Sequence, residues 1–212
     1  LYSYTEYTQR KEVPLENFKD WAYMSNIFSY LGVHYVDALR FVTNAKPKRV
    51  CATGQKYFLI QKGLDTYDSV QCNIEWEINT DIIFNQCIIC SWIESNKSSS
   101  ISKQDFHIIG TNGRLDCEQK ERGLKILTDN NSTEDINPDF TKIYSYMGSY
   151  IFEGYGIDSI NKFLGNVMDR NYNSNDNRIC NLEESLYSTS VIEAATESLR
   201  RGAIWIDVNS II

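Results

Sequence analysis

The side chains of this 212-residue chain that are best suited to catalysis are grouped around one of its two histidines. His34 lies in the segment YLGVHYVDALRF, four residues after Tyr30 and three before Asp37. In a helix these three side chains share one face. An imidazole transfers protons near neutral pH, and a nearby carboxylate can hold its tautomer and raise its basicity. Proton transfer at His34 is therefore one interpretation, and a helix histidine satisfied by a local aspartate is the other.

Other motifs of catalysis and cofactor binding are missing from the sequence. His107, in the strand-like segment DFHIIG, is expected to be a structural residue at the surface or in an interface. The chain has no G-x-G-x-x-G after a predicted strand, no P-loop, no H-E-x-x-H and no G-x-S-x-G. We therefore predict no cofactor-binding and no metal-binding residues in this chain.

Six cysteines are spread along the chain, and most lie in apolar segments typical of strands. Cys87 and Cys90 have C-x-x-C spacing, but positions three apart in a strand point to opposite faces. We therefore expect buried structural thiols, which favours a reducing, cytoplasmic compartment. N-glycosylation motifs then carry no meaning, because this modification requires secretion. The cysteines are Cys51, Cys72, Cys87, Cys90, Cys117 and Cys180, and the motifs begin at Asn96, Asn130 and Asn131.

Composition and charge exclude several classes of protein. A net charge of −7 and a pI near 4.9 argue against sequence-independent nucleic-acid binding, which needs a basic face. No apolar run reaches the roughly 18 residues that cross a membrane. A hydrophobic fraction of 42% suffices for a packed core without disulfides or metals. We therefore predict a soluble, acidic, globular protein.

The hydrophobic periodicity predicts the elements that position the candidate site. Residues 15–44 have helical spacing, with Ser25 or Asn26 as the N-cap and Asn44 and Pro47 at the end. The apolar positions that recur in this segment are Ile27, Leu31, Tyr35, Leu39 and Val42.

Residues 48–128 have the two-residue period of an antiparallel meander. The strand 69–78 is apolar on one face, and a tight turn at 79–81 leads into the strand 82–93. That second strand is apolar on both faces, which places it in the centre of the sheet or in an interface. Asn112-Gly113 predicts a hairpin with a type I′ turn. The apolar set of the first strand is Val70, Cys72, Ile74, Trp76 and Ile78; the second has Phe84, Ile88 and Trp92 on one face and Ile83, Ile89 and Ile93 on the other.

After a polar loop at 129–138 the helical period returns in 157–167 and 182–199, and Gly202 stops the second helix. A short strand is expected at 203–208. Helix, meander and helices make an α+β fold: a large open antiparallel or mixed sheet with helices packed on one face. The other face is then available for oligomerisation.

Four segments in register resemble one known family. They are the Y-L-G-V-H-Y-V-D-A-L-R-F-V helix after Trp21, the K-P-K-R-V strand, the G-T-N-G-R-L-D-C-E hairpin and the closing S-V-I-E-A-A-T-E-S-L-R-R-G-A. Nearly the whole chain is similar to the C-terminal domain of the Gfo/Idh/MocA oxidoreductases, which include glucose–fructose oxidoreductase and inositol dehydrogenase. Its fold is of the type found in the C-terminal domain of dihydrodipicolinate reductase.

The resemblance implies a substrate, a cofactor and roles for particular residues. Members oxidise or reduce a sugar or polyol hydroxyl with NAD or NADP, which an N-terminal Rossmann domain binds. We therefore expect residues 1–212 to be a substrate-binding and oligomerisation domain that lacks the Rossmann domain and is inactive alone. By the same resemblance, His34 is the catalytic residue, and Tyr30, Asp37 and Trp21 bind substrate. A cytoplasmic homo-oligomer, at least a dimer, through the open sheet face is also implied.

The sequence departs from the family at one position next to the histidine. Many members have an aspartate four residues before it, where this chain has Tyr30. A phenol is a poor general base at pH 7, so the usual Asp–His pair is missing. Lys46-Pro47 does not replace the family's catalytic Lys-Pro, because it begins the strand after the helix. A non-catalytic ligand-sensing, regulatory or oligomerisation protein of the same fold therefore stays open, as does an unrelated interaction module.

Overall fold

The computed structural model describes residues 1–119, 123–130, 133–136, 141–154, 156–168 and 182–210. Within these ranges the strands are β1 (Tyr2–Arg10), β2 (Lys46–Gln55), β3 (Ser69–Ile78), β4 (Ile82–Glu94), β5 (Ser102–Gly110), β6 (Gly113–Glu118), β7 (Gly123–Thr128), β8 (Glu134–Ile136), β9 (Thr141–Tyr146), β10 (Ser149–Gly154) and β11 (Ile206–Asp207). The helices are α1 (Val33–Thr43), α2 (Phe58–Gln61), α3 (Ile157–Met168) and α4 (Leu182–Arg200).

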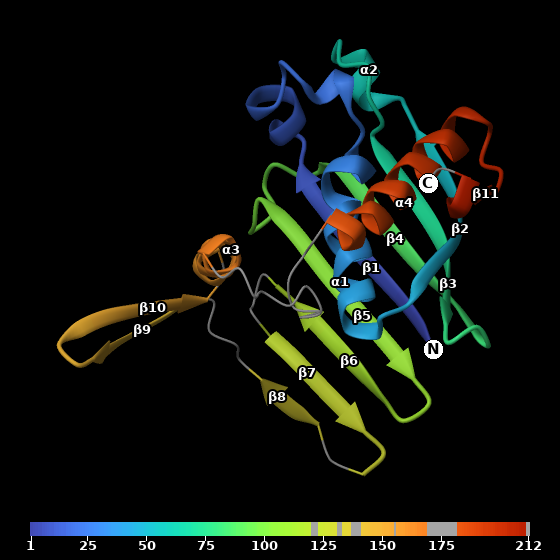
Figure 1. The fold of residues 1–212 in the computed structure, drawn as a ribbon. Helices are drawn as coiled ribbons and strands as arrows, with labels where there is room; N and C mark the ends of the chain where they lie inside the picture. Colours follow the sequence, from blue (N-terminus) through green and yellow to red (C-terminus); the bar gives the residue numbers. More distant parts are fainter. Residues whose placement is uncertain (120–122, 131–132, 137–140, 155, 169–181, 211–212) are drawn as a thin grey trace.

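Nine of these strands form one mixed sheet in the order β11-β2-β3-β4-β1-β5-β6-β7-β8. Helices α1 and α4 lie side by side across one face of it (Figure 1). We call this face the inner face and the opposite one the outer face. This arrangement confirms the predicted α+β class with helices on one side of an open sheet. No helix within the described ranges is long and apolar enough to span a membrane.

Strands β3 and β4 form as their alternation predicts. Trp76 of β3 and Ile88 of β4 are fully buried on the inner face, whereas Ile83 of β4 is 49% exposed on the outer face. The turn between the strands uses Asn79 and Thr80 in the left-handed region, with φ of 52° and 67°. Strand β4 lies between β3 and β1, so its predicted central place is confirmed.

Strand β1 was not predicted, although it pairs with β4 in parallel and with β5 in the antiparallel sense. Its pattern is inverted: Ser3 and Thr5 are buried on the inner face, while Tyr2 and Tyr4 are 52% and 40% exposed on the outer face. A search for buried apolar alternation therefore misses this strand. The buried Ser3 hydroxyl donates a hydrogen bond to the His107 carbonyl at 2.7 Å, which satisfies this polar group inside the sheet.

The predicted helix at 15–44 is broken into several pieces. Two π-helical turns (Val13–Asn17 and Phe28–Gly32) and a 3-10 turn (Ala22–Met24) precede the regular helix α1. The amide oxygen of Asn26 accepts a hydrogen bond from the Ser29 backbone N–H at 2.9 Å, as its capping role predicts. Ile27, Leu31, Tyr35 and Leu39 are buried, but Val42 is 56% exposed, so its assignment to the apolar face was wrong.

Helix α4 packs on β2 and beside α1, and it ends before Gly202, whose φ is 77°. The hydroxyl of Ser198 is fully buried, accepts a hydrogen bond from the Ala52 N–H at 2.9 Å and donates one to the Ile204 carbonyl at 2.6 Å. The final strand, β11, is shorter than the predicted 203–208.

The segment before α4 differs most from prediction. The hairpin β9–β10 was not predicted; it projects from the sheet, with α3 at its base (Figure 1). Helix α3 does form, but its apolar side chains do not cover the sheet: Phe163 is 65% exposed and Leu164 is 49% exposed. Strand β8 lies within the expected polar loop. The cysteine at 180 lies outside the described residues.

The β5–β6 hairpin is present, but its turn was predicted wrongly. Gly110 pairs with Gly113, so Thr111 and Asn112 are the two turn residues. Neither Asn112 nor Gly113 has a positive φ, so this is not the expected type I′ turn. A Cβ at Gly113 would lie 2.4 Å from the Leu127 carbonyl oxygen of β7, so close backbone approach explains this glycine.

Candidate functional site

His34 lies in the first turn of α1 with its side chain exposed, at the surface and outside the hydrophobic core. Its ring neighbour is Tyr7 of β1, at 6.4 Å between ring centroids and an interplanar angle of 44°. Within the described residues, the His34 side chain makes no hydrogen bond or ion pair, and the exposed Asp37 side chain makes none either. The imidazole is therefore accessible to a ligand and is not held by the local carboxylate.

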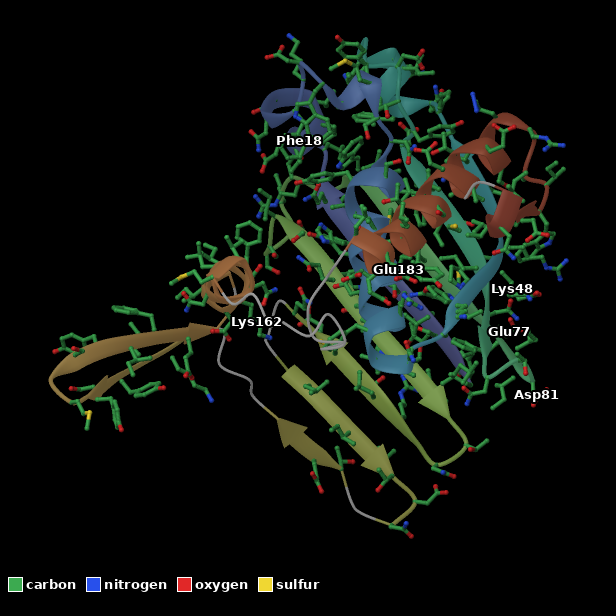
Figure 2. All side chains as sticks on the ribbon, viewed as in Figure 1. Phe18, Lys48, Glu77, Asp81, Lys162 and Glu183 are labelled. Carbon is green, nitrogen blue, oxygen red and sulfur yellow. The ribbon has the colours of Figure 1, made fainter. Side chains whose placement is uncertain are left out.

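Trp21 and Tyr30 come together in an aromatic cluster beside this helix. Their ring centroids are 5.4 Å apart, and both rings contact Phe18, at 4.6 Å and 5.2 Å. Tyr30 also lies 6.3 Å from Trp92 of β4. Figure 2 shows Phe18 of this cluster far from Asp81 in the β3–β4 turn. The cluster thus brings together two of the four sequence-predicted site residues.

Tyr30 belongs to a π-helical turn, and this changes its relation to His34. In a regular α-helix a spacing of four residues would stack the two side chains. The wider π turn, with i→i+5 hydrogen bonds, places residues four apart differently around the axis. Tyr30 packs against Trp21 and Trp92, while His34 contacts Tyr7.

Tyr7 is the neighbour of this site that sequence reasoning missed. Its ring makes a T-shaped contact with Tyr35, at 5.7 Å and 85°, as well as the tilted contact with His34. Burial, followed by the nearby Cys117 and Tyr7, raises the pKa of Tyr35 well above its ordinary value, so this phenol stays protonated. Only the unpredicted strand β1 brings Tyr7 here, so no local signal could have identified it.

Helix α1 is fixed over the sheet by polar contacts at both ends. The Arg40 guanidinium is 7% exposed, donates to the two Glu184 carboxylate oxygens of α4 at 2.8 and 2.9 Å, and lies 3.8 Å from the Tyr187 ring centroid. Nearer His34, the buried Gln86 amide of β4 donates to the Tyr35 carbonyl at 3.0 Å. These contacts hold α1, and with it the backbone that carries the exposed His34, in place over the inner face.

His107 lies on the outer face and is held by its neighbours. Its Nδ1 is 2.5 Å from Asp116, which also accepts hydrogen bonds from Arg114 at 2.6 and 2.8 Å. The Tyr4 ring stacks on the imidazole at 4.2 Å. Partial burial opposes ionisation of Asp116, but the His107 and Arg114 hydrogen bonds outweigh it and lower the pKa of this carboxyl. The arrangement agrees with the expected structural role.

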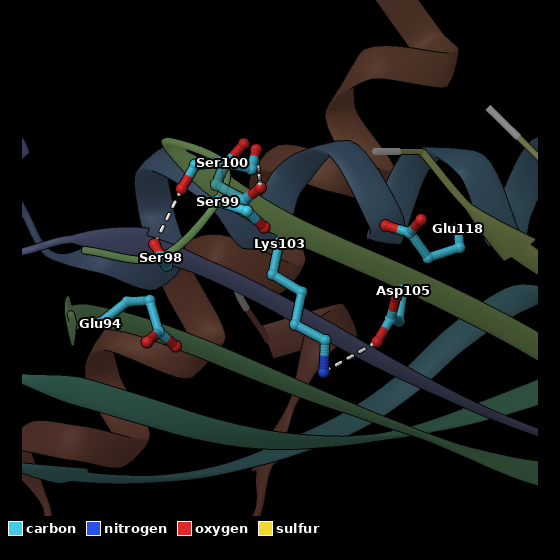
Figure 3. Close-up of a pocket in the computed structure, with 8 residues that line it drawn as sticks. Glu94, Ser98, Ser99, Ser100, Lys103, Asp105 and Glu118 are labelled. Atoms are coloured by element: carbon cyan, nitrogen blue, oxygen red, sulfur yellow. Dashed lines mark hydrogen bonds and ion pairs between the residues drawn. The ribbon is translucent and has the colours of Figure 1, made fainter. Parts of the chain in front are cut away.

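A cavity of about 410 Å³ lies on the outer face, near the ends of β4 and β5 (Figure 3). Lys103 and Asp105 pair across it at 3.0 Å, and Glu94, Glu118 and several serines complete the lining. Phe106 of β5 is buried on the inner face. Lys103 and Asp105 are an odd number of positions away from it, so they lie on the outer face. The cavity is therefore separated from His34 by the thickness of the sheet.

The described residues lack the groups that a metal ion or a dinucleotide requires. They contain no group of three or more His, Cys, Asp or Glu side chains that could hold a metal ion. None of their strand-to-helix connections carries the Gly-rich turn that cradles a pyrophosphate. These parts of the chain therefore do not fit NAD, and we assign no step through the cofactor to them.

Comparisons with known proteins place this fold among oxidoreductases. The family model described as "Oxidoreductase family, C-terminal alpha/beta domain" (GFO_IDH_MocA_C) matches residues 10–208. No curated protein sequence matches the chain significantly.

Solved structures with the same fold are distant in sequence. An oxidoreductase from Sinorhizobium meliloti has 15% identity and a TM-score of 0.67, over 97% of this chain and 56% of its own. An inositol dehydrogenase homolog from Azotobacter vinelandii, complexed with NADH and myo-inositol, has 13% identity and a TM-score of 0.64, over 97% and 56%. Levoglucosan dehydrogenase, in complex with NADH and L-sorbose, has 15% identity and a TM-score of 0.69, over 100% and 59%.

The chain thus spans little more than half the length of these relatives, and identities this low establish the fold alone. The family model carries the assignment further, because it covers most of the 212 residues. On that match, this chain belongs to the Gfo/Idh/MocA oxidoreductase family, whose C-terminal α/β domain it contains.

Proposed function

We propose that this chain is the substrate-binding part of an NAD(P)-dependent oxidoreductase that acts on a sugar or polyol hydroxyl. The observation that carries the proposal is the exposed His34 imidazole on α1 in a domain of this family; the aromatic pair Trp21 and Tyr30 lies on the segment that leads into the same helix. Supporting it, two relatives of the same fold were solved with myo-inositol and L-sorbose, both rich in hydroxyl groups.

In this proposal His34 holds the reacting hydroxyl and accepts its proton as the carbon is oxidised. An imidazole suits this role because it exchanges protons near neutral pH. Asp37, three residues along the exposed surface of α1, and the Trp21–Tyr30 pair bind the rest of the substrate. The dinucleotide is bound by a part of the enzyme other than the described residues, and the isolated 212-residue chain is inactive.

The test uses an enzyme in which this domain is joined to its dinucleotide-binding domain. Replacing a general base lowers kcat/KM by roughly 10²–10⁴-fold, which is the expected effect of His34→Ala on polyol oxidation. Val42→Ala, an exposed change at the far end of α1, serves as the control and leaves the rate unchanged. If His34→Ala retains activity within about twofold of the parent, His34 is structural and the catalytic assignment fails.

We also propose that the outer face mediates self-association. Ile83, Ile89 and Ile93 of β4 are 37–49% exposed there, and no described helix covers them. Tyr2 and Tyr4 of β1, also exposed, pair with Asn85 and Cys87, the two positions between Ile83 and Ile89 on this face. Exposed apolar residues gathered on one face favour association. Sedimentation should show a dimer or larger assembly that Ile89→Lys dissociates. A monomer at high micromolar concentration would contradict the proposal.

One observation favours the alternative of a non-catalytic, ligand-sensing protein. Tyr30, which replaces the family's aspartate, packs against three aromatic rings, and a phenol is a weak base. In that case polyols should still perturb the NMR signals of His34 and Trp21. The complete protein should then show no NAD-dependent turnover.

A further inference from the structure

Tyr7, on the unpredicted strand β1, is the ring neighbour of His34 at the candidate site. We propose that Tyr7 is a positioning residue: its ring supports one side of the His34 imidazole and sets the orientation in which that imidazole meets a substrate hydroxyl. The proposal rests on the proposed function of His34 as the substrate-facing group. It assigns a role to a side chain that sequence reasoning did not identify.

Tyr7 itself is fixed by its neighbours. Tyr7 lies on the inner face of β1, paired in register with the fully buried Cys90 of β4 and with Gln104 of β5. Its ring packs edge-on against Tyr35, which is 3% exposed and whose backbone carbonyl accepts the Gln86 hydrogen bond. A ring that packs against a buried helix residue, on a strand paired on both sides, has little freedom to move.

The other candidate residues do not hold the His34 imidazole. Asp37 makes no hydrogen bond or ion pair within the described residues, and Tyr30 is engaged by Phe18, Trp21 and Trp92. The Tyr7 ring centroid lies 6.4 Å from that of His34, within the range of interacting aromatic pairs. Catalytic groups act efficiently only when their geometry is set in advance, so a rigid ring here has a direct use.

The chain provides a matched control on the same strand. Tyr4, on the opposite face of β1, stacks on His107 at 4.2 Å, so each of the two histidines has its own tyrosine. The ring current of an aromatic side chain shifts the resonances of nearby protons. The imidazole signals of the 212-residue chain therefore report both contacts separately, and His34→Asn and His107→Asn assign them.

The experiment records imidazole ¹H–¹³C spectra of the parent chain and three variants. Tyr7→Leu should move the His34 signals toward those of a freely rotating histidine and leave His107 unchanged. Tyr4→Leu should do the reverse. Tyr7→Phe keeps the aromatic ring and should therefore preserve the parent His34 signals. This variant shows that the change in Tyr7→Leu is due to loss of the ring.

Three results would overturn the proposal. In the first, Tyr7→Leu leaves the His34 signals in place. In the second, Tyr7→Leu and Tyr4→Leu each move both histidines, which indicates a general loss of structure. In the third, Tyr7→Phe behaves like Tyr7→Leu, so that the hydroxyl and not the ring is responsible. The spectra are read without substrate, so they stay interpretable even if titration with myo-inositol leaves His34 unperturbed and the proposed function fails.

Discussion

The two histidines, one on each face of the sheet, differ in how many partners their imidazoles have. On the outer face, His107 is held by Asp116, which Arg114 also binds, and by the stacked Tyr4 ring. On the helical side, His34 has no hydrogen bond or ion pair within the described residues, only the Tyr7 ring beside it. An imidazole whose polar groups are satisfied within the protein suits a structural role. One that is positioned but unsatisfied can bind a ligand.

The two faces also obtain their stability by different means. The inner face excludes water, since Trp76, Ile74 and Ile88 are fully buried under α1 and α4. The outer face carries cross-strand ion pairs such as Lys103 with Glu6, at 2.7 Å, between exposed side chains. Burial of apolar area dominates folding free energy, whereas exposed ion pairs contribute little. The comparison therefore predicts unequal effects of matched substitutions.

The largest effect is expected from Trp76→Ala on the inner face of β3. Removing a fully buried indole leaves a cavity and should lower the free energy of unfolding by about 3–5 kcal/mol. Asn73→Ala, on the outer face of the same strand, should change it by less than about 0.5 kcal/mol. Urea unfolding followed by circular dichroism measures both. Equal losses of unfolding free energy for the two variants would contradict the predicted difference between the two faces.

A smaller effect is expected from two ion pairs, one on each face. Glu184→Gln removes the carboxylate that binds the nearly buried Arg40 guanidinium, and should cost about 1–2 kcal/mol because Glu184 itself is 40% exposed. Glu6→Gln on the outer face should cost about 0–1 kcal/mol, since Lys103 keeps water and Asp105 as partners. Urea unfolding measures the loss of stability in both variants. A larger loss for Glu6→Gln than for Glu184→Gln would contradict the predicted order.

Much of the fold could be predicted from the sequence because its signals are local. The alternation of β3 and the doubly apolar β4 identified two strands at the centre of the sheet. Asn26 and Asn44 marked the limits of the helical region through capping and a left-handed C-cap with φ of 53°. Each of these features depends on residues a few positions apart, so the pattern alone was enough.

The unpredicted elements have non-local causes. The buried face of β1 meets α1, a helix later in the chain, through the Tyr7–Tyr35 contact, and Tyr30 in the π-helical turn before α1 packs against Trp21 and Trp92 of β4. The hairpin β9–β10 and the exposed apolar residues of α3 were likewise not evident from periodicity.

Sequence pattern alone was enough to place His34 on a helix, because residue type and helical spacing are local properties. The surroundings of His34 follow from the tertiary structure. Tyr30 lies in a π-helical turn and packs against Trp21 and Trp92, whereas Tyr7, from a strand 27 positions earlier, lies beside His34. Contacts between residues so far apart depend on how strands pair and helices pack, and no short segment of sequence encodes that.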